Sequence, residues 1–229
     1  MDMERAGNYS DGGGHVGRAY IPTHTERRER TGIGIGGLKM DREEALTIVR
    51  EHVKNENLVR HMLAVEAAVR YYAEKLGEDV ELWGLAGLLH DFDWEIHPSL
   101  EHHPQDGAPI LRERGVPEVI VQAILSHADH TGVPRQTTME KALYACEEIT
   151  GLITAVALVR PSKAIMDVKV KSVKKKWKNQ AFAAGANREE IEHAAEDFGV
   201  ELWEHVGNVI TAMQGIADEL GLQGESIGD

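Results

Sequence analysis

Cysteine is nearly absent from this chain, which has one cysteine among 229 residues. A single thiol can form no intramolecular disulfide and no zinc site built from cysteines. Cys146 lies in the apolar run of residues 142–157, where we expect a small buried hydrophobe because thiols in apolar surroundings are unreactive. The sequence therefore argues against a disulfide scaffold, a cysteine-based zinc module and a cysteine nucleophile.

A long apolar segment and an excess of positive charge are also missing. No window reaches the roughly 20 apolar residues that span a bilayer, and the first 14 residues are polar and glycine-rich, unlike a secretory signal. The 38 acidic residues outnumber the 25 lysines and arginines, which gives a net charge of −13. Such a charge opposes general affinity for nucleic acid. We expect a soluble, cytoplasmic protein with neither membrane nor nucleic-acid partners.

Strand patterns and internal repeats are not visible, and helical periodicity takes their place from Asp41 onward. Asp41 suits an N-cap, and Gly77 suits the residue after a helix. Thr137 to Glu140 has the capping-box pattern and opens a long apolar helix that Pro161 ends. Two more helices are expected after Asn187 and Val200, ending near Gly221. The predicted fold class is all-α.

The composition divides the chain into a tail and one helical domain. Residues 1–39 are rich in glycine and lack helical periodicity, which predicts a disordered tail. Residues 40–222 are expected to form a helical bundle, since 42% apolar content is enough for a core. Within it, a candidate metal-site core covers about residues 57–154, and C-terminal helices cover about 162–222.

Histidine is plentiful where cysteine is missing: seven of twelve histidines lie between His61 and His130. A predicted helix after Asp79 ends in His90-Asp91, a pair whose side chains can turn toward one cation. Each histidine taken singly could be a core or capping residue, but their order together with the acids indicates a metal site. Histidine and carboxylate ligands suit Zn, Fe, Mn, Co or Ni. The ordered set is His61, His90, Asp91, His103, His127 and an acid at Glu147.

This order of residues resembles the HD superfamily of metal-dependent phosphohydrolases, and the resemblance covers Asn57 to about Thr154. The segment His103-Pro104-Gln105-Asp106-Gly107-Ala108 is similar to the His-Pro-x-x-Gly-Ala segment of two-metal members, including HD-GYP proteins and diadenosine tetraphosphate hydrolases. Residues from 142 to 177 also resemble a branch of predicted HD hydrolases.

The resemblance implies an HD-domain helical bundle with extra C-terminal helices and one or two divalent metal ions, with Mg left open. One ion would be held by His61, His90, Asp91 and Glu147, and a second by His103 and His127 with Asp91 bridging. The implied reaction is hydrolysis of a phosphate ester of a nucleotide or related small molecule by a metal-activated water, which makes His90 and Asp91 catalytic. The superfamily usually has Asp where this chain has Glu147, and Glu148 is the rival ligand if the register shifts by one.

Other polar residues have less specific roles. His130 is a candidate catalytic proton donor or third-metal ligand, whereas His102 suits an exposed loop. The remaining histidines are expected on the surface or on helix faces. Six lysines between Lys169 and Lys178 form either a phosphate-binding surface or a solvated helix face. The candidate substrate-binding residues are Arg160, Lys171 and Lys174.

Two further classes of function compete with a hydrolase. A catalytically weak or inactive nucleotide-binding or regulatory module is an alternative because of Glu147. A purely structural helical protein would leave the joint occurrence of His90, Asp91, His103 and His127 unexplained. The expected partner is a small phosphorylated substrate, and a homodimer is left open.

Overall fold

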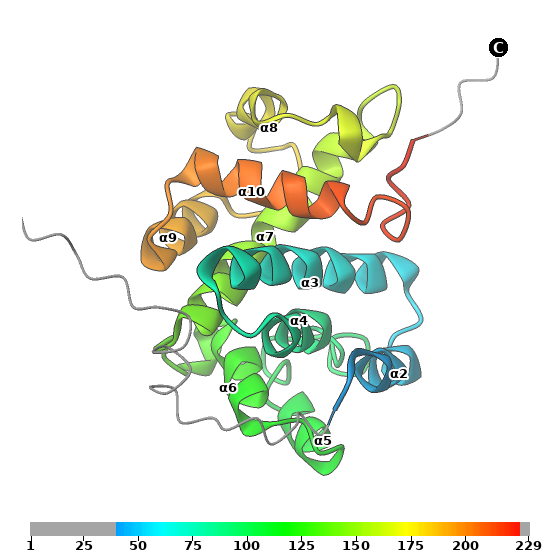
Figure 1. The fold of residues 1–229 in the computed structure, drawn as a ribbon, viewed down its shortest axis with the longest axis vertical. Coiled ribbons are helices and arrows are strands. Elements are labelled where there is room, and N and C mark those ends of the chain that lie inside the picture. The colour runs from blue at the N-terminus through cyan, green and yellow to red at the C-terminus, as the bar shows by residue number, and fades with distance from the viewer. Residues whose placement is uncertain (1–39, 225–229) are drawn as a thin grey trace, which may run out of the picture. The chain divides into compact units, whose positions relative to one another are not determined.

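A computed structural model of the chain describes residues 40–224, so the tail predicted for residues 1–39 lies outside the described part. Within 40–224 the chain forms α-helices, two short 3-10 helices and no β-strand, apart from one isolated bridge between Ala164 and Gln223. The all-α prediction is confirmed. None of the helices in this range has the length and apolar character needed to cross a bilayer. The helices in Figure 1 are α2 (Arg42–His52), α3 (Glu56–Leu76), α4 (Val80–Leu89), α5 (Gly107–Glu113), α6 (Glu118–Ser126), α7 (Thr138–Leu158), α8 (Val170–Trp177), α9 (Arg188–Phe198) and α10 (Leu202–Gln214), with 3-10 helices η1 (Asp129–Thr131) and η2 (Ile165–Asp167).

The helix ends follow the predicted capping residues. Asp41 caps α2 and Thr137 caps α7, each in a capping box with a glutamate three residues later. Gly77 follows α3 with φ 72°, a left-handed conformation that favours glycine. One predicted end was wrong, because α10 stops at Gln214 and turns follow it to Gly221.

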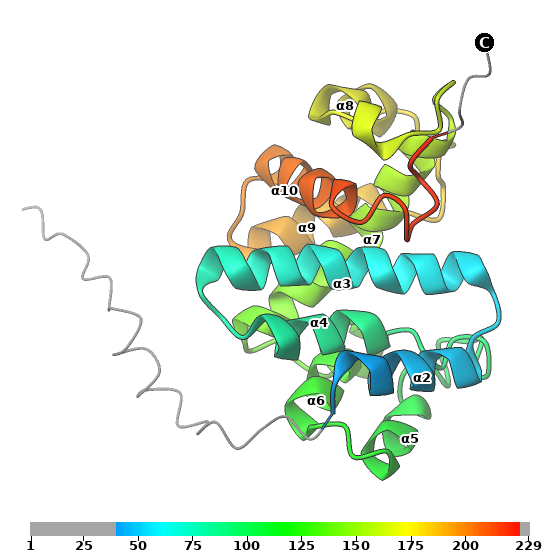
Figure 2. The same cartoon turned by 45° about the vertical axis from the view of Figure 1, so that its right-hand side comes forward.

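Helix α3 lies at the centre of the helices, with α4 on one side and α10 on the other (Figures 1 and 2). The close approach of α3 and α4 depends on Gly87. A Cβ at this position would come within 2.8 Å of the Glu66 backbone and of the Val69 side chain. Because His90 directly follows α4, this contact brings it next to His61 on α3.

Helix α7 connects the helices around α3 with the C-terminal helices. It contacts α3 and α6 on the one hand and α8, α9 and α10 on the other. Figure 2 shows it crossing behind α3. Its residues are buried on nearly every side, as the apolar pattern predicted. Cys146 is fully buried in α7, and desolvation raises the pKa of its thiol. This environment agrees with the prediction that Cys146 is an unreactive, buried residue.

A buried polar link ties the C-terminal helices to this core. His205 of α10, expected only on a surface or helix face, is fully buried and donates its Nε2–H to the Ala145 carbonyl at 2.8 Å. Its Nδ1 therefore accepts from the Tyr72 hydroxyl at 2.6 Å. Asn208 donates to the same hydroxyl at 3.2 Å. Burial lowers the pKa of His205, so its neutral form joins α3, α7 and α10.

Candidate metal centre

Two of the candidate ligands lie at the C-terminal ends of helices, where free carbonyls orient their rings. His90 follows α4 and lies 2.8 Å from the Gly87 carbonyl through Nδ1. His127 follows α6 and lies 2.5 Å from the Ile124 carbonyl through Nδ1. A carbonyl only accepts, so in both neutral rings Nδ1 carries the proton and Nε2 keeps its lone pair.

The other two histidines are oriented by side chains. His103, in the loop before α5, donates its Nδ1–H to Asp93 at 2.8 Å. His61 of α3 places Nδ1 3.4 Å from the Thr150 hydroxyl, which donates its own proton to the Glu147 carbonyl at 2.7 Å. The Thr150 oxygen can therefore only accept from His61. In their neutral forms these two rings also present Nε2 as a lone pair.

Asp91 lies between two pairs of histidines. Its Oδ2 is 3.7 Å from Nε2 of His61 and 3.5 Å from Nε2 of His90. Its Oδ1 is 3.3 Å from Nε2 of His103 and 3.7 Å from Nε2 of His127. The side chains thus form two groups of three that share Asp91, with the ligand atoms of each group within 4.8 Å of one another. We call these two groups together the metal centre.

The donor set fits divalent metal ions. Nε2 of His61 and of His90 are 3.3 Å apart, and those of His103 and His127 are 3.4 Å apart. In these tautomers neither nitrogen of a pair has a proton to share, so the two lone pairs repel unless a cation or a proton lies between them. Imidazole and carboxylate together suit first-row transition metals. Each group could hold one ion.

Burial and charge shift the pKa values of these groups in opposite directions. Desolvation lowers the pKa of His90 and of His127 to about 4. Burial also opposes protonation of His103, but Asp91 and Asp93 outweigh it and raise its pKa to about 9. Burial disfavours ionised Asp91, but the histidines outweigh it and hold its pKa well below the usual range. Metal binding would therefore displace a proton from His103.

Asp93 belongs to the site, and the sequence analysis missed it. Its side chain is fully buried, and it contacts His97 at 3.2 Å in addition to His103 at 2.8 Å. A Cβ on Gly107 would come within 2.5 Å of the Asp93 carboxylate, so glycine leaves the room it needs. A carboxylate on the far nitrogen of a ligand histidine fixes the ring orientation. The only signal in the sequence was a second acid two residues after Asp91.

Glu147 and Glu148 point to different partners. Oε1 of Glu147 is 3.6 Å from Nε2 of His61, although Glu147 lies outside the group of three. Glu148 accepts from the Asn187 backbone at 3.3 Å, and burial with Glu147 nearby raises its pKa to about 7. Of the two acids, Glu147 is therefore the one that faces a histidine of the metal centre. Both glutamates line a cavity of about 350 Å³, together with His61, Gly151, Ala183, Gly185 and Ala186.

The other two histidines considered in the sequence lie outside the metal centre. His130 is exposed, and its Nε2 donates to the backbone carbonyl of His103 at 2.7 Å. A proton-donor role would therefore need its other nitrogen. His102 is exposed, as expected, and pairs with Asp106 at 2.6 Å.

None of the three predicted substrate-binding residues has a described contact with a residue of the metal centre. Arg160 and Lys171 line a different cavity, between α7 and α8. The Lys174 ammonium lies over the Trp203 ring, 4.6 Å from its centroid. Their predicted role in binding the substrate therefore stays a prediction.

The fold and the site together define an all-α bundle with a histidine-aspartate centre, and this part of the chain is similar to a known family. Residues 58–152 match the HD domain. This match, which covers less than half of the chain, agrees with the resemblance seen in the sequence. All the candidate metal ligands lie within the matched residues.

Relatives among curated proteins match the chain over about half its length. Ribonuclease Y of Nitratidesulfovibrio vulgaris is 30% identical over 120 residues, which cover 52% of this chain and 23% of the ribonuclease. Ribonuclease Y of Lactobacillus acidophilus is 28% identical over 120 residues, covering 52% and 22%. An uncharacterized protein of Methanocaldococcus jannaschii is 35% identical over 109 residues, covering 45% and 63%. The chain thus spans less than a quarter of these ribonucleases, and no solved structure matches it.

Proposed function

We propose that this chain hydrolyses a phosphate ester of a nucleotide or a related small molecule at the metal centre. The observation that carries the proposal is Asp91, whose two oxygens face two separate histidine pairs. Divalent ions held in the two groups would polarise the phosphate and activate a water for attack on phosphorus. The P–O ester bond would break, and the departing oxygen would take up a proton.

The residues of the chain prepare this site before any substrate arrives. The Gly87 and Ile124 carbonyls orient His90 and His127, and Asp93 orients His103. Ligands fixed in this way lose little freedom when they bind an ion. Glu147 would complete the group around His61 and is our choice over Glu148.

The cavity beside His61 suits a small substrate. Its volume of about 350 Å³ lies in the range of small-molecule sites. A phosphate entering there would lie next to His61 and Glu147, which connects the cavity to the metal centre. We therefore place the body of the substrate in this cavity.

RNA is the second candidate substrate, because several curated relatives are named ribonucleases. The cavity lining contains Glu147 and Glu148 but no lysine or arginine. A polyanion needs cations along its backbone, and the chain carries a net charge of −13. These observations favour a small substrate over a polymer.

The first test is the metal content per chain, by elemental analysis of protein purified without a histidine tag or chelator. About two ions per chain would support a centre bridged by Asp91. The second test is hydrolysis of p-nitrophenyl phosphate, mononucleotides, dinucleoside polyphosphates and short RNA. Asp91→Asn is compared with Asp106→Asn, a matched change at an exposed loop aspartate. We expect wild type and control, but not Asp91→Asn, to hydrolyse a small ester.

Each other outcome has a distinct meaning. Turnover of RNA alone would favour the second candidate. Bound metal and bound nucleotide without turnover of any substrate would favour the binding or regulatory module suggested by Glu147. Failure to take up any divalent metal would overturn the proposed mechanism.

A further inference from the structure

A second cavity, of about 420 Å³, lies between the C-terminal end of α7 and α8. We call it the α7–α8 cavity. Its lining combines apolar side chains with cationic ones, and it includes no carboxylate. The lining residues are Val156, Val159, Pro161, Arg160, Lys171, Ser172, Lys175 and Lys176.

The α7–α8 cavity is separate from the metal centre. Val156 follows Glu147 on α7, about 14 Å further along at 1.5 Å per residue. At about 100° per residue it also points to the side of α7 opposite Glu147. Arg160 lies beyond the end of this helix. Both views show α8 far from α4 and α6, which carry His90 and His127 at their ends (Figures 1 and 2). The two cavities share no lining residue.

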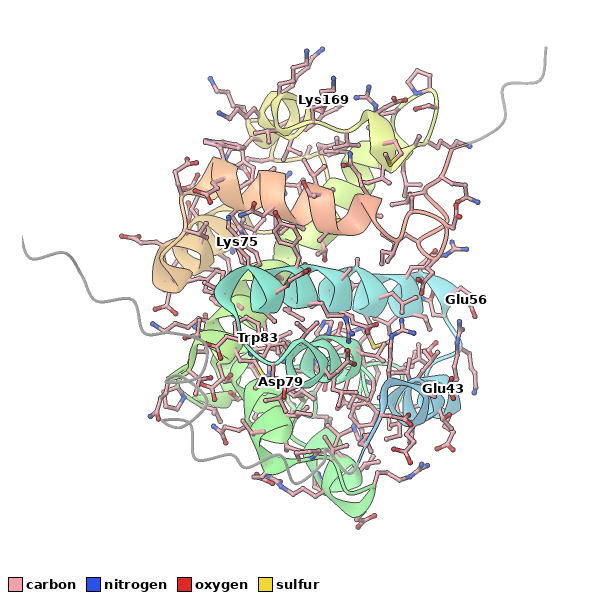
Figure 3. All side chains as sticks on the ribbon, viewed as in Figure 1. Glu43, Glu56, Lys75, Asp79, Trp83 and Lys169 are labelled. Carbon is pink, nitrogen blue, oxygen red and sulfur yellow. The ribbon has the colours of Figure 1, made fainter. Side chains whose placement is uncertain are left out.

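The positive charge of the cavity is not neutralised by nearby acids. Among residues 40–224, no ion pair involves Arg160, Lys171, Lys175 or Lys176. Figure 3 shows nitrogen-tipped side chains projecting around α8 near the labelled Lys169. An uncompensated basic surface in a chain of net charge −13 is a local exception. It would attract an anion of matching size.

Two polar groups in the cavity also lack acceptors. Nε of Arg160 is buried with no hydrogen-bond partner, while its Nη1 donates to the Ser172 hydroxyl at 3.3 Å. The same hydroxyl accepts the backbone N–H of Lys169 at 3.3 Å. With both lone pairs used, Ser172 still has its own proton to donate. A ligand with several acceptor oxygens would accept from the Ser172 hydroxyl and from the lysines of the lining.

We propose that the α7–α8 cavity binds a small organic polyphosphate, of the nucleoside di- or triphosphate class. The phosphates would contact Arg160, Lys171 and Lys175, and the apolar part of the ligand would lie on Val156 and Val159. Several cations in one cavity suit more than one phosphate charge. A bare inorganic anion would leave the apolar residues of the lining without a contact, whereas a nucleoside would cover them. This site does not depend on the reaction proposed at the metal centre.

The test is calorimetric titration of the whole 229-residue chain, free of metal, with ATP in buffer without chelator. The double variant Lys171→Gln/Lys175→Gln removes two exposed charges and leaves the buried core intact. Lys178→Gln is the matched control, because Lys178 is an exposed lysine at the end of α8 that lines neither cavity. We expect the double variant to bind ATP at least about tenfold more weakly, since two charge-assisted contacts are lost. The control and Asp91→Asn should bind like wild type.

The same titrations can overturn the proposal. ATP binding that is lost in Asp91→Asn but kept in the double variant would assign the nucleotide to the metal centre. Short single-stranded RNA that binds more tightly than ATP through the same lysines would assign the surface to a polymer. Inorganic tripolyphosphate that binds as tightly as ATP would exclude the role given to Val156 and Val159. Failure of wild type to bind ATP would reject the site, whatever the hydrolysis assays show.

Discussion

The two sites along α7 have opposite character. In the metal centre the side chains are mostly buried histidines and acids, and backbone or carboxylate partners fix the tautomers of the rings. In the α7–α8 cavity Lys171 and Lys175 are exposed and have no ion-pair partner among the described residues. Buried polar groups must be satisfied by hydrogen bonds or by a metal ion, whereas exposed charges can remain solvated. The first site is thus part of the folded core, and the second lies on its surface.

Because the two sites and the buried polar link at His205 differ in burial and charge, substitutions in each of them should have different effects. A change in the metal centre should affect metal binding and activity, and a change in the buried polar link at His205 should affect stability. A change on α8 should affect only the binding of an anion.

The largest effect is expected for Asp91→Asn. The amide cannot supply two anionic oxygens to the two histidine pairs, so activity should fall more than about a thousandfold, as when a metal-activated nucleophile is lost. Added metal should raise the melting temperature of wild type but not that of the variant, because only a folded state that binds the ion is stabilised. Asp106→Asn should respond like wild type. Activity of the variant within tenfold of wild type would contradict the bridging role.

The next effect concerns stability rather than chemistry. His205→Ala leaves the Tyr72 hydroxyl without its acceptor and removes the donor to the Ala145 carbonyl, which should cost about 2–4 kcal/mol in the free energy of unfolding. Chemical denaturation measures this loss. His193→Ala, at an exposed position of α9, should change it by less than about 0.5 kcal/mol. Metal content per chain should be unchanged in folded His205→Ala, and a loss of metal would mean that the two regions are coupled.

A smaller loss is expected for Asp93→Ala. Without this carboxylate the His103 ring is free to turn, so metal affinity or activity should fall by about 10–100-fold. Asp93→Asn keeps an acceptor oxygen and should lose less. Glu101→Ala, at an exposed residue of the same loop, is the control. Equal losses in Asp93→Ala and Asp93→Asn would argue against positioning through a hydrogen bond.

The smallest effect is a pH dependence of stability. The pKa of His205 is lowered in the folded state, while the unfolded chain takes up a proton near pH 6.5. The contribution of His205 to the free energy of unfolding is therefore fully present above about pH 6.5. It decreases as the pH falls, by at most about 1.4 kcal/mol per pH unit. The stability difference between wild type and His205→Gln should shrink between pH 7 and pH 5. A difference that stays constant would show that His205 titrates alike in both states.

Local sequence was enough to predict most of the helices and the similarity of residues 58–152 to the HD domain. Caps such as Asp41, Gly77 and Thr137 act on backbone groups a few residues away, so their effect can be recognised without knowing the fold. The order of histidines and acids indicated the HD superfamily, because each ligand type occurs at a recognisable place in the chain. The prediction extended α10 too far, because it passed over Gly215, which directly follows the last helical residue Gln214.

Tertiary structure decided how the side chains are used. Which oxygen of Asp91 faces which histidine pair depends on the packing of α4 on α3, and hence on the space left at Gly87. The buried position of Asp93 and the separation of Lys171 from His61 are also invisible in sequence spacing. Residues distant in the chain meet only through packed helices, and burial then determines whether an acid orients a ligand or is simply solvated.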